Sequence, residues 1–284
     1  MKKKGFFGYG RCPHCETFLK EKDLEKNICW SCAKVLKEKQ KNKKIKTGSI
    51  NDADGISYDT VKIGSQVWMA ENLKVTHYQN GDIIDYIIDF NDWVNTSEGA
   101  YCNPHNDENN VRTFGRLYNW YAINDIRGIS PKGWHIPKSY ELDELITYLG
   151  GEKIASGKLK SLGTIENGDG LWDLWESTTE KYEATNDYGF SAVPSGNRQG
   201  DMEKGVWEFA RLGNSASFWS SSGGFDFDSI RQDLKQYAPS YLYKESLDKL
   251  GPADAYAYSL APGPLVWKQP MNIRSGMSVR CIKD

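Results

Sequence analysis

The sequence contains no run of about 18 consecutive apolar residues, which excludes a conventional membrane-spanning helix. It also lacks a nucleophile elbow, a phosphate-binding loop, a dinucleotide-binding fingerprint and a paired-histidine metal motif, so no motif indicates a common enzyme class. Residues 5–11, which follow the initial lysines, form no hydrophobic region and lead to no small-residue cleavage site. We therefore expect a chain that is cytoplasmic as synthesised. Export by a non-Sec route or on a phage particle is the alternative.

The formal charge of −2 is the sum of a basic N-terminal part and a longer acidic part. Residues 1–50 contain 14 Lys and Arg against 5 Asp and Glu, whereas residues 51–284 contain 22 against 33. The acidic part carries 31 of the 36 aromatic residues, which is too much rigid apolar area for a disordered chain. It is also long enough to bury a sizeable core. The sequence thus predicts a small basic N-terminal part followed by a folded acidic domain.

Four of the six cysteines form two Cys-x-x-Cys pairs, Cys12 with Cys15 and Cys29 with Cys32. A structural zinc ion takes about four thiolate or imidazole ligands in a tetrahedron, and each pair supplies two sulfurs from one side. A redox or disulfide role is the alternative, but it needs a thioredoxin-like βαβ unit that the surrounding residues do not indicate. The spacing predicts a structural Zn²⁺ site in residues 1–35, which resemble the small bacterial zinc ribbons.

Residues 36–53 form a basic linker in this interpretation. Seven Lys and Arg lie within residues 33–46, without the interleaved aromatic residues that stack on single-stranded nucleic acids. A lysine run neutralises phosphates whatever the base sequence, so contact with nucleic acid is one hypothesis. We favour a solvated helical linker that ends at Gly48.

The acidic part has the pattern of an α+β domain. From Gly55 onward, short β-branched and aromatic runs are interrupted at Gly64-Ser65, and Asn80-Gly81 predicts a hairpin turn with two positive φ angles. The clearest helix is predicted from Ser139, as its cap, to Leu149, because leucines and isoleucine recur there at helical spacing. A second helix is predicted over residues 117–123. Few helices and many turns favour twisted antiparallel sheet.

Several segments together resemble a known family. They include Gly-Trp-His-Ile-Pro at 133–137 and Ser-Val-Arg-Cys at 278–281, and the others are residues 54–73, 115–122, 157–161, 186–196 and 218–222. In this order they resemble the Fibrobacter succinogenes major paralogous domain, abundant in Bacteroidetes-type bacteria, over residues 54–284. The resemblance implies the C-type-lectin-like fold of the formylglycine-generating-enzyme branch. That fold displays loops that bind sugars or proteins.

We therefore expect a non-catalytic binding or display module for a protein or carbohydrate ligand, tethered through the zinc ribbon. An apparent insertion at residues 224–252 follows the Trp-Ser-Ser motif, where two short helices are predicted. The predicted ligand contacts are aromatic: Trp219, Tyr237, Tyr241 and Tyr243. One alternative is a retroelement-diversified or phage-associated receptor-binding protein. The other is an oxidoreductase like the formylglycine-generating enzymes.

The oxidoreductase alternative would use a thiol pair, and only Cys102 and Cys281 remain for it. We expect these two residues to be buried thiols, or a disulfide if they meet. His135 is isolated in sequence, and a hydrogen-bonding role in the core is favoured over catalysis. Residues 103–110 offer oxygen ligands for Ca²⁺, although such Asn/Asp clusters more often form turns whose side chains bond their own backbone.

Overall fold

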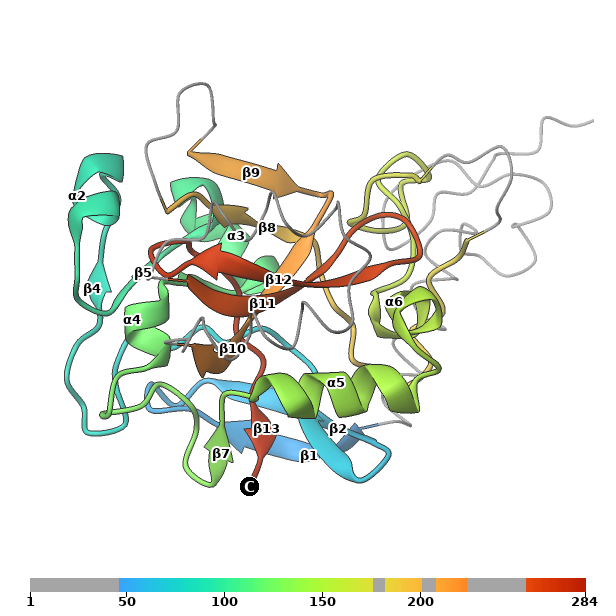
Figure 1. Cartoon of the computed structure of the whole chain (residues 1–284), viewed down its shortest axis with the longest axis horizontal. Helices are drawn as coiled ribbons and strands as arrows, with labels where there is room; N and C mark the ends of the chain where they lie inside the picture. Colours follow the sequence, from blue (N-terminus) through green and yellow to red (C-terminus); the bar gives the residue numbers. More distant parts are fainter. Residues whose placement is uncertain (1–45, 176–181, 201–207, 224–253) are drawn as a thin grey trace, which may run out of the picture.

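The computed structural model describes residues 46–175, 182–200, 208–223 and 254–284. The predicted zinc ribbon, most of the linker and the insertion at 224–252 lie outside the described residues. The described part is mostly β-structure with few helices, arranged as three sheets (Figure 1), and this confirms the α+β class.

The first sheet brings the last strand beside the first ones. Its order is β1 (Lys46–Asn51), β2 (Ser57–Ile63), β3 (Gln66–Met69), β13 (Ile282–Lys283) and β7 (Trp134–His135). All neighbours are antiparallel, and a tight turn at Gly64, with φ +61, joins β2 to β3. Because β13 lies between β3 and β7, it carries the final residues next to His135.

Strand β1 corrects the predicted linker. Residues 48–51 pair with residues 57–60 of β2, so they belong to the sheet and are not helical. Polar residues such as Thr47 and Ser49 can form an edge strand because their backbone groups find partners in the antiparallel neighbour. The first sheet thus begins before residue 54, where the sequence analysis placed the start of the domain.

The second sheet has the order β12 (Val266–Asn272), β11 (Asp254–Leu260), β10 (Ala216–Gly223), β8 (Ser195–Arg198) and β9 (Phe209–Leu212). The third has the order β4 (Asp85–Tyr86), β5 (Ala100–Cys102) and β6 (Leu117–Tyr118). Strand pairs are antiparallel except β8 with β10 and β4 with β5. Antiparallel pairing thus dominates, as the short runs and frequent turns predict.

The Ser-Val-Arg-Cys segment connects the three sheets. Isolated β-bridges just before and at the start of this segment pair Gly276 with Arg198, Met277 with Tyr118 and Ser278 with Phe218. The buried Arg280 guanidinium donates to the Asn72 side chain at 2.7 Å and to the Ser191 carbonyl at 3.1 Å. A charged group in the interior is stable only when its donors are satisfied, so this arginine fixes the position of the segment.

In the described residues, the helices are α2 (Phe90–Asn95), α3 (Glu108–Phe114), α4 (Trp120–Ile123), α5 (Ser139–Tyr148) and α6 (Glu152–Leu159), with a short 3₁₀ helix η2 (Pro104–Asn106). Helix α5 runs between the first and second sheets (Figure 1). It is bonded to both: Gln66 donates to the Glu141 carbonyl at 2.9 Å, and the Tyr258 hydroxyl donates to the Ser139 carbonyl at 2.9 Å. This helix therefore links the two sheets.

The predicted helix at 139–149 is confirmed, but its cap is Lys138 and not Ser139. The Glu141 carboxylate accepts the Lys138 N–H at 2.8 Å, which satisfies one free donor at the helix start. Ser139 cannot cap because its hydroxyl hydrogen-bonds to Ser220 and its N–H donates to Ser222.

Two other local predictions are corrected in part. Within the predicted helix at 117–123, residues 117–118 are β6, and the helix begins only after Asn119, whose side chain accepts the Ala122 N–H. At Asn80-Gly81 the turn forms, but only Gly81 has a positive φ, +92.

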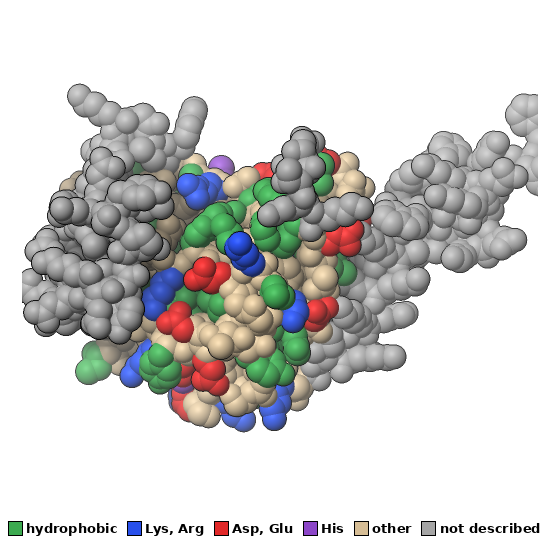
Figure 2. Space-filling model, turned by 45° about the vertical axis from the view of Figure 1, so that its right-hand side comes forward, with side chains coloured by type: hydrophobic (Ala, Val, Ile, Leu, Met, Phe, Trp, Pro, Cys, Tyr) green, Lys and Arg blue, Asp and Glu red, His purple; other side chains and the backbone are tan. Residues whose placement is uncertain are grey.

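The core consists of three clusters of buried side chains. The largest fully buried aromatic residues are Trp68, Trp93 and Trp219. On α5, Leu142, Leu145 and Ile146 pack in the second cluster with β2 and β10 residues. On the face shown in Figure 2, acidic and basic side chains are interspersed and are not separated by sign.

Candidate functional site

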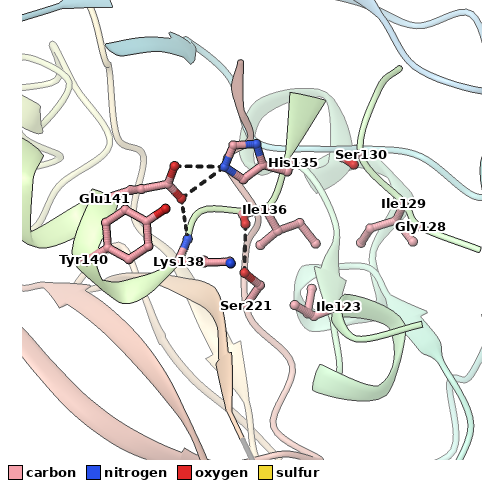
Figure 3. A pocket seen from close by; sticks show the side chains of 10 residues that line it. All are labelled: Ile123, Gly128, Ile129, Ser130, His135, Ile136, Lys138, Tyr140, Glu141 and Ser221. Atoms are coloured by element: carbon pink, nitrogen blue, oxygen red, sulfur yellow. Dashed lines mark hydrogen bonds and ion pairs between the residues drawn. The ribbon is translucent and has the colours of Figure 1, made fainter. Parts of the chain in front are cut away.

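A pocket of about 460 Å³ opens between the start of α5 and the segment that joins α4 to β7. Figure 3 shows its two sides, with the charged residues from the α5 end facing Ile123, Gly128 and Ile129. Its lining residues are Ile123, Gly128, Ile129, Ser130, His135, Ile136, Lys138, Tyr140, Glu141 and Ser221. They come from segments far apart in the sequence, so the pocket exists only in the folded chain.

The apolar side is formed by Ile123, Ile129 and Ile136, whose side chains are almost fully buried. Helix α4 ends at Ile123, and a turn follows in which the Gly128 N–H donates to the Asp125 carbonyl. Gly128 has a positive φ of +66 in this turn. Gln79 then holds the segment, because its N–H donates to the Gly128 carbonyl and its side chain to the Ser130 carbonyl. The aliphatic surface is therefore held in place before any ligand arrives.

The polar side is organised around His135. Its Nδ1 lies 2.6 Å from an Asp284 carboxylate oxygen, and its Nε2 lies 3.0 Å from both oxygens of Glu141. Pairing of β7 with β13 brings Asp284 to the ring, while the first turn of α5 supplies Glu141. The imidazole is thus held between two carboxylates at the pocket wall.

These contacts set the charge of the site. Burial alone lowers the pKa of His135, but the hydrogen bonds and charges of Asp284 and Glu141 outweigh it and raise the pKa above 6.5. Both carboxylates thus bond to the ring, and Glu141 also accepts the Lys138 N–H. Among the described residues, the exposed Lys138 ammonium makes no ion pair, which leaves it as the pocket's available charge.

The two serine hydroxyls in the pocket have protein partners. Ser221 Oγ donates to the Ile136 carbonyl at 3.0 Å, and Ser130 Oγ accepts from the Gln79 side chain at 3.4 Å. Within the part of the chain that the structure describes, no serine hydroxyl bonds to His135, so this ring activates neither Ser130 nor Ser221. The pocket offers a ligand its shape, an apolar wall and the positive charge of Lys138.

His135 shows where the sequence interpretation fell short. We predicted a hydrogen-bonding role in the core, and the hydrogen bonds are present, but the side chain is 37 % exposed and lines a pocket. The acidic helix that follows Gly-Trp-His-Ile-Pro was the available signal, because it supplies Glu141. Nothing in the sequence indicated that Asp284, which is 149 positions from His135, would contact its ring.

Trp219 does not lie at the surface. Its side chain is 0 % exposed, packs in the first core cluster and donates its indole N–H to the Tyr118 carbonyl at 2.8 Å. This burial argues against the predicted ligand contact, because a fully enclosed ring cannot reach a ligand. The other predicted contacts, Tyr237, Tyr241 and Tyr243, and the zinc ligands Cys12, Cys15, Cys29 and Cys32 lie outside the described residues.

Cys102 and Cys281 are free, fully buried thiols in different core clusters. In the structure the two thiols do not meet as a disulfide. Burial raises the pKa of Cys102 to about 12 and that of Cys281 above its usual range. Since the thiolate is the reactive form, neither residue is prepared for thiol chemistry.

The Asn/Asp cluster at 103–110 is occupied with local hydrogen bonds. Asp107 caps α3 by accepting the Asn109 N–H at 2.9 Å, and the Asn103 amide donates to Glu108 at 2.7 Å and accepts from Arg116. In the described ranges, no group of three or more His, Cys, Asp or Glu residues could hold a metal ion. Calcium at this cluster stays a prediction.

Comparison with known proteins gives one match. Residues 61–283 match the family model described as the Fibrobacter succinogenes major domain. No curated protein and no solved structure matches the chain. Across the described segments, no helix is long and apolar enough to cross a membrane.

Proposed function

The chain belongs to the Fibrobacter succinogenes major domain family, and we propose that its domain is a non-catalytic module that binds a protein or glycan ligand in the pocket beside His135. The observation that carries this proposal is the pocket itself, which combines a fixed aliphatic wall with an available lysine and two serines that His135 does not activate. Ligand pockets typically combine an apolar lining with a few placed polar groups.

A C-type-lectin-like fold belongs to the same proposal. It is supported by the mostly antiparallel sheets, the few helices and the terminal strand β13, which lies beside β3 and β7. In such a scaffold, loops between the sheets carry the ligand site. The pocket is built in this way, since residues 124–133 and 136–138 lie between elements.

The tether is a separate part of the proposal. We assign one structural zinc ion to Cys12, Cys15, Cys29 and Cys32, and we assign to the zinc ribbon the role of attaching the domain to a partner. The basic segment before β1 serves as a spacer. Contact of its lysines with nucleic acid is the competing role, and a gel shift at low salt distinguishes the two.

The oxidoreductase alternative loses its main argument because Cys102 and Cys281 are buried in separate clusters. A binding role needs no reactive thiol. It requires only that the pocket wall remain accessible.

The proposal is tested by blocking the pocket. The full-length protein is applied to a glycan array and a peptide array beside two variants, Lys138→Trp and Lys132→Trp. Both lysines are exposed, but only Lys138 lines the pocket. We expect Lys138→Trp to lose the retained ligands and Lys132→Trp to keep them. Equal retention by both variants would place binding elsewhere and refute the proposal.

A further inference from the structure

We propose that the ligand of this pocket is a peptide segment carrying an aliphatic side chain next to a carboxylate, rather than a glycan. This inference rests on the proposed binding function of the pocket. It follows from the chemistry of the two pocket sides, Ile123, Ile129 and Ile136 on one and Lys138 with Tyr140 on the other.

The aliphatic side favours a hydrocarbon group over a sugar. A saccharide carries a hydroxyl on nearly every ring carbon, and each hydroxyl must keep a hydrogen-bond partner when it leaves water. The three isoleucines offer none, and the Ser221 hydroxyl already donates to the Ile136 carbonyl. A leucine, isoleucine or valine side chain needs no such partner and gains from burial against the same surface.

The charged side favours an acidic group. Glu141 and Asp284 both bond to His135, which offsets part of their negative charge. Within the described residues, Lys138 lacks an ion-pair partner, and a ligand carboxylate would supply one. Charge complementarity at Lys138 therefore favours an anionic group beside this lysine.

Tyr140 adds a contact typical of peptide recognition. Its ring is 63 % exposed next to Lys138, and tyrosine is enriched where protein interfaces are anchored. The pocket volume of about 460 Å³ lies in the usual range for ligand sites, about 300–1,000 Å³. One aliphatic side chain and its acidic neighbour fit this description.

Immobilised hexapeptides test the inference with the full-length protein. One series pairs Leu with Asp, a second pairs Leu with Lys, and a third pairs Ser with Asp in the same flanking sequence. We expect the Leu-Asp series to bind best. Lys138→Met, which keeps the aliphatic stem, should weaken it roughly three- to fivefold at low salt, as expected for a partly exposed ion pair. The matched control Lys132→Met should leave binding unchanged.

Neutral and acidic glycans are tested in parallel. Glycan binding that depends on Lys138, with no peptide binding, would overturn the ligand class while leaving the binding function standing. If neither array shows binding that Lys138→Trp abolishes, both the inference and the proposed function fail. Preference for the Leu-Lys series would overturn the charge assignment.

Discussion

The carboxylate of Glu141 serves His135 and the start of α5 at once. It lies 3.0 Å from His135 Nε2 and accepts the Lys138 N–H at 2.8 Å. The protonation of the pocket histidine is therefore coupled to the cap of the helix that carries Lys138 and Tyr140. A substitution of Glu141 should therefore change the pKa of His135, and deprotonation of His135 should affect the start of α5.

Replacing Glu141 tests this coupling. Glu141→Gln keeps the size of the side chain and an oxygen that can accept the Lys138 N–H, but it removes the charge, so the pKa of His135 should fall. We expect a loss of about 0.3–1 kcal/mol in the free energy of unfolding, the range for a charge that favours the first turn of a helix. Histidine NMR titration and urea unfolding measure the two effects.

The control is Glu144→Gln, which lies on the same helix but bonds to Ser65, and it should leave the His135 pKa unchanged. An unaltered His135 pKa in Glu141→Gln would contradict the coupling.

The raised pKa of His135 gives stability a defined pH dependence. The folded state binds the proton more tightly than the unfolded chain, whose histidine titrates near 6.5. The contribution is therefore complete below pH of about 6.5 and is lost as pH rises through the folded-state pKa.

Comparison with His135→Gln across pH isolates this contribution. The difference in unfolding free energy from the wild type should be largest in mild acid and shrink at alkaline pH. His105→Gln serves as a control, because His105 stacks on Phe209 and has no carboxylate partner in the described part of the chain. A difference that grows with pH would have the wrong sign for a raised pKa.

The sequence pattern predicted those helices and strands that are determined by the residues within the segment itself. The two β-runs on either side of Gly64-Ser65 and the helix at 139–149 were predicted from the residues within each segment, and they are β2, β3 and α5 in the structure. Strand β1 was missed because its residues are polar and lysine-rich on the N-terminal side. Its strand form comes from pairing with β2, which sequence periodicity does not report.

Most of the candidate site could not be predicted from the sequence, because long-range contacts bring its residues together. His135 and Glu141 lie six positions apart and belong to one recognisable motif. Asp284 reaches the site because β13 pairs with β7, and Ser221 reaches it through bonds to the Ile136 and Pro137 carbonyls. Trp219 was predicted as a ligand contact because an exposed aromatic ring can stack on a sugar. Its burial depends on packing against Tyr118 and β11, a long-range property.

The buried position of Trp219 predicts a large effect on stability. Trp219→Ala should lower the free energy of unfolding by roughly 3–5 kcal/mol, because a cavity forms and the Tyr118 carbonyl loses its donor. Trp267→Ala, at a side chain 41 % exposed, is the matched control and should cost less than about 1 kcal/mol. Urea unfolding compares the two. Full stability of Trp219→Ala would contradict the core assignment.

The two buried thiols should resist modification in the native protein. Burial and a raised pKa leave almost no accessible thiolate at Cys102 or Cys281 at neutral pH. Alkylation with iodoacetamide followed by peptide mapping should leave both unmodified when folded and modify both in guanidinium chloride without reductant. A peptide pair joined through Cys102 and Cys281 in the unreduced digest would show a disulfide instead.

Removal of metal should separate the two parts of the chain. The predicted zinc ligands Cys12, Cys15, Cys29 and Cys32 all precede β1, and the described domain has three core clusters of its own. Because structural zinc supplies folding energy to the residues that bind it, EDTA should unfold residues 1–35 and leave the melting of the domain unchanged.

Metal analysis and calorimetry of the full chain measure both parts of this prediction. The wild type should hold about one zinc ion per chain, as a single four-ligand site requires, and Cys12→Ser should lose it. Cys102→Ala is the matched cysteine control and should keep the metal, since Cys102 lies within the domain core. The domain transition should appear at the same temperature with and without EDTA. A single melting transition that disappears with EDTA would mean that the domain depends on the metal, and would contradict two independently folding parts.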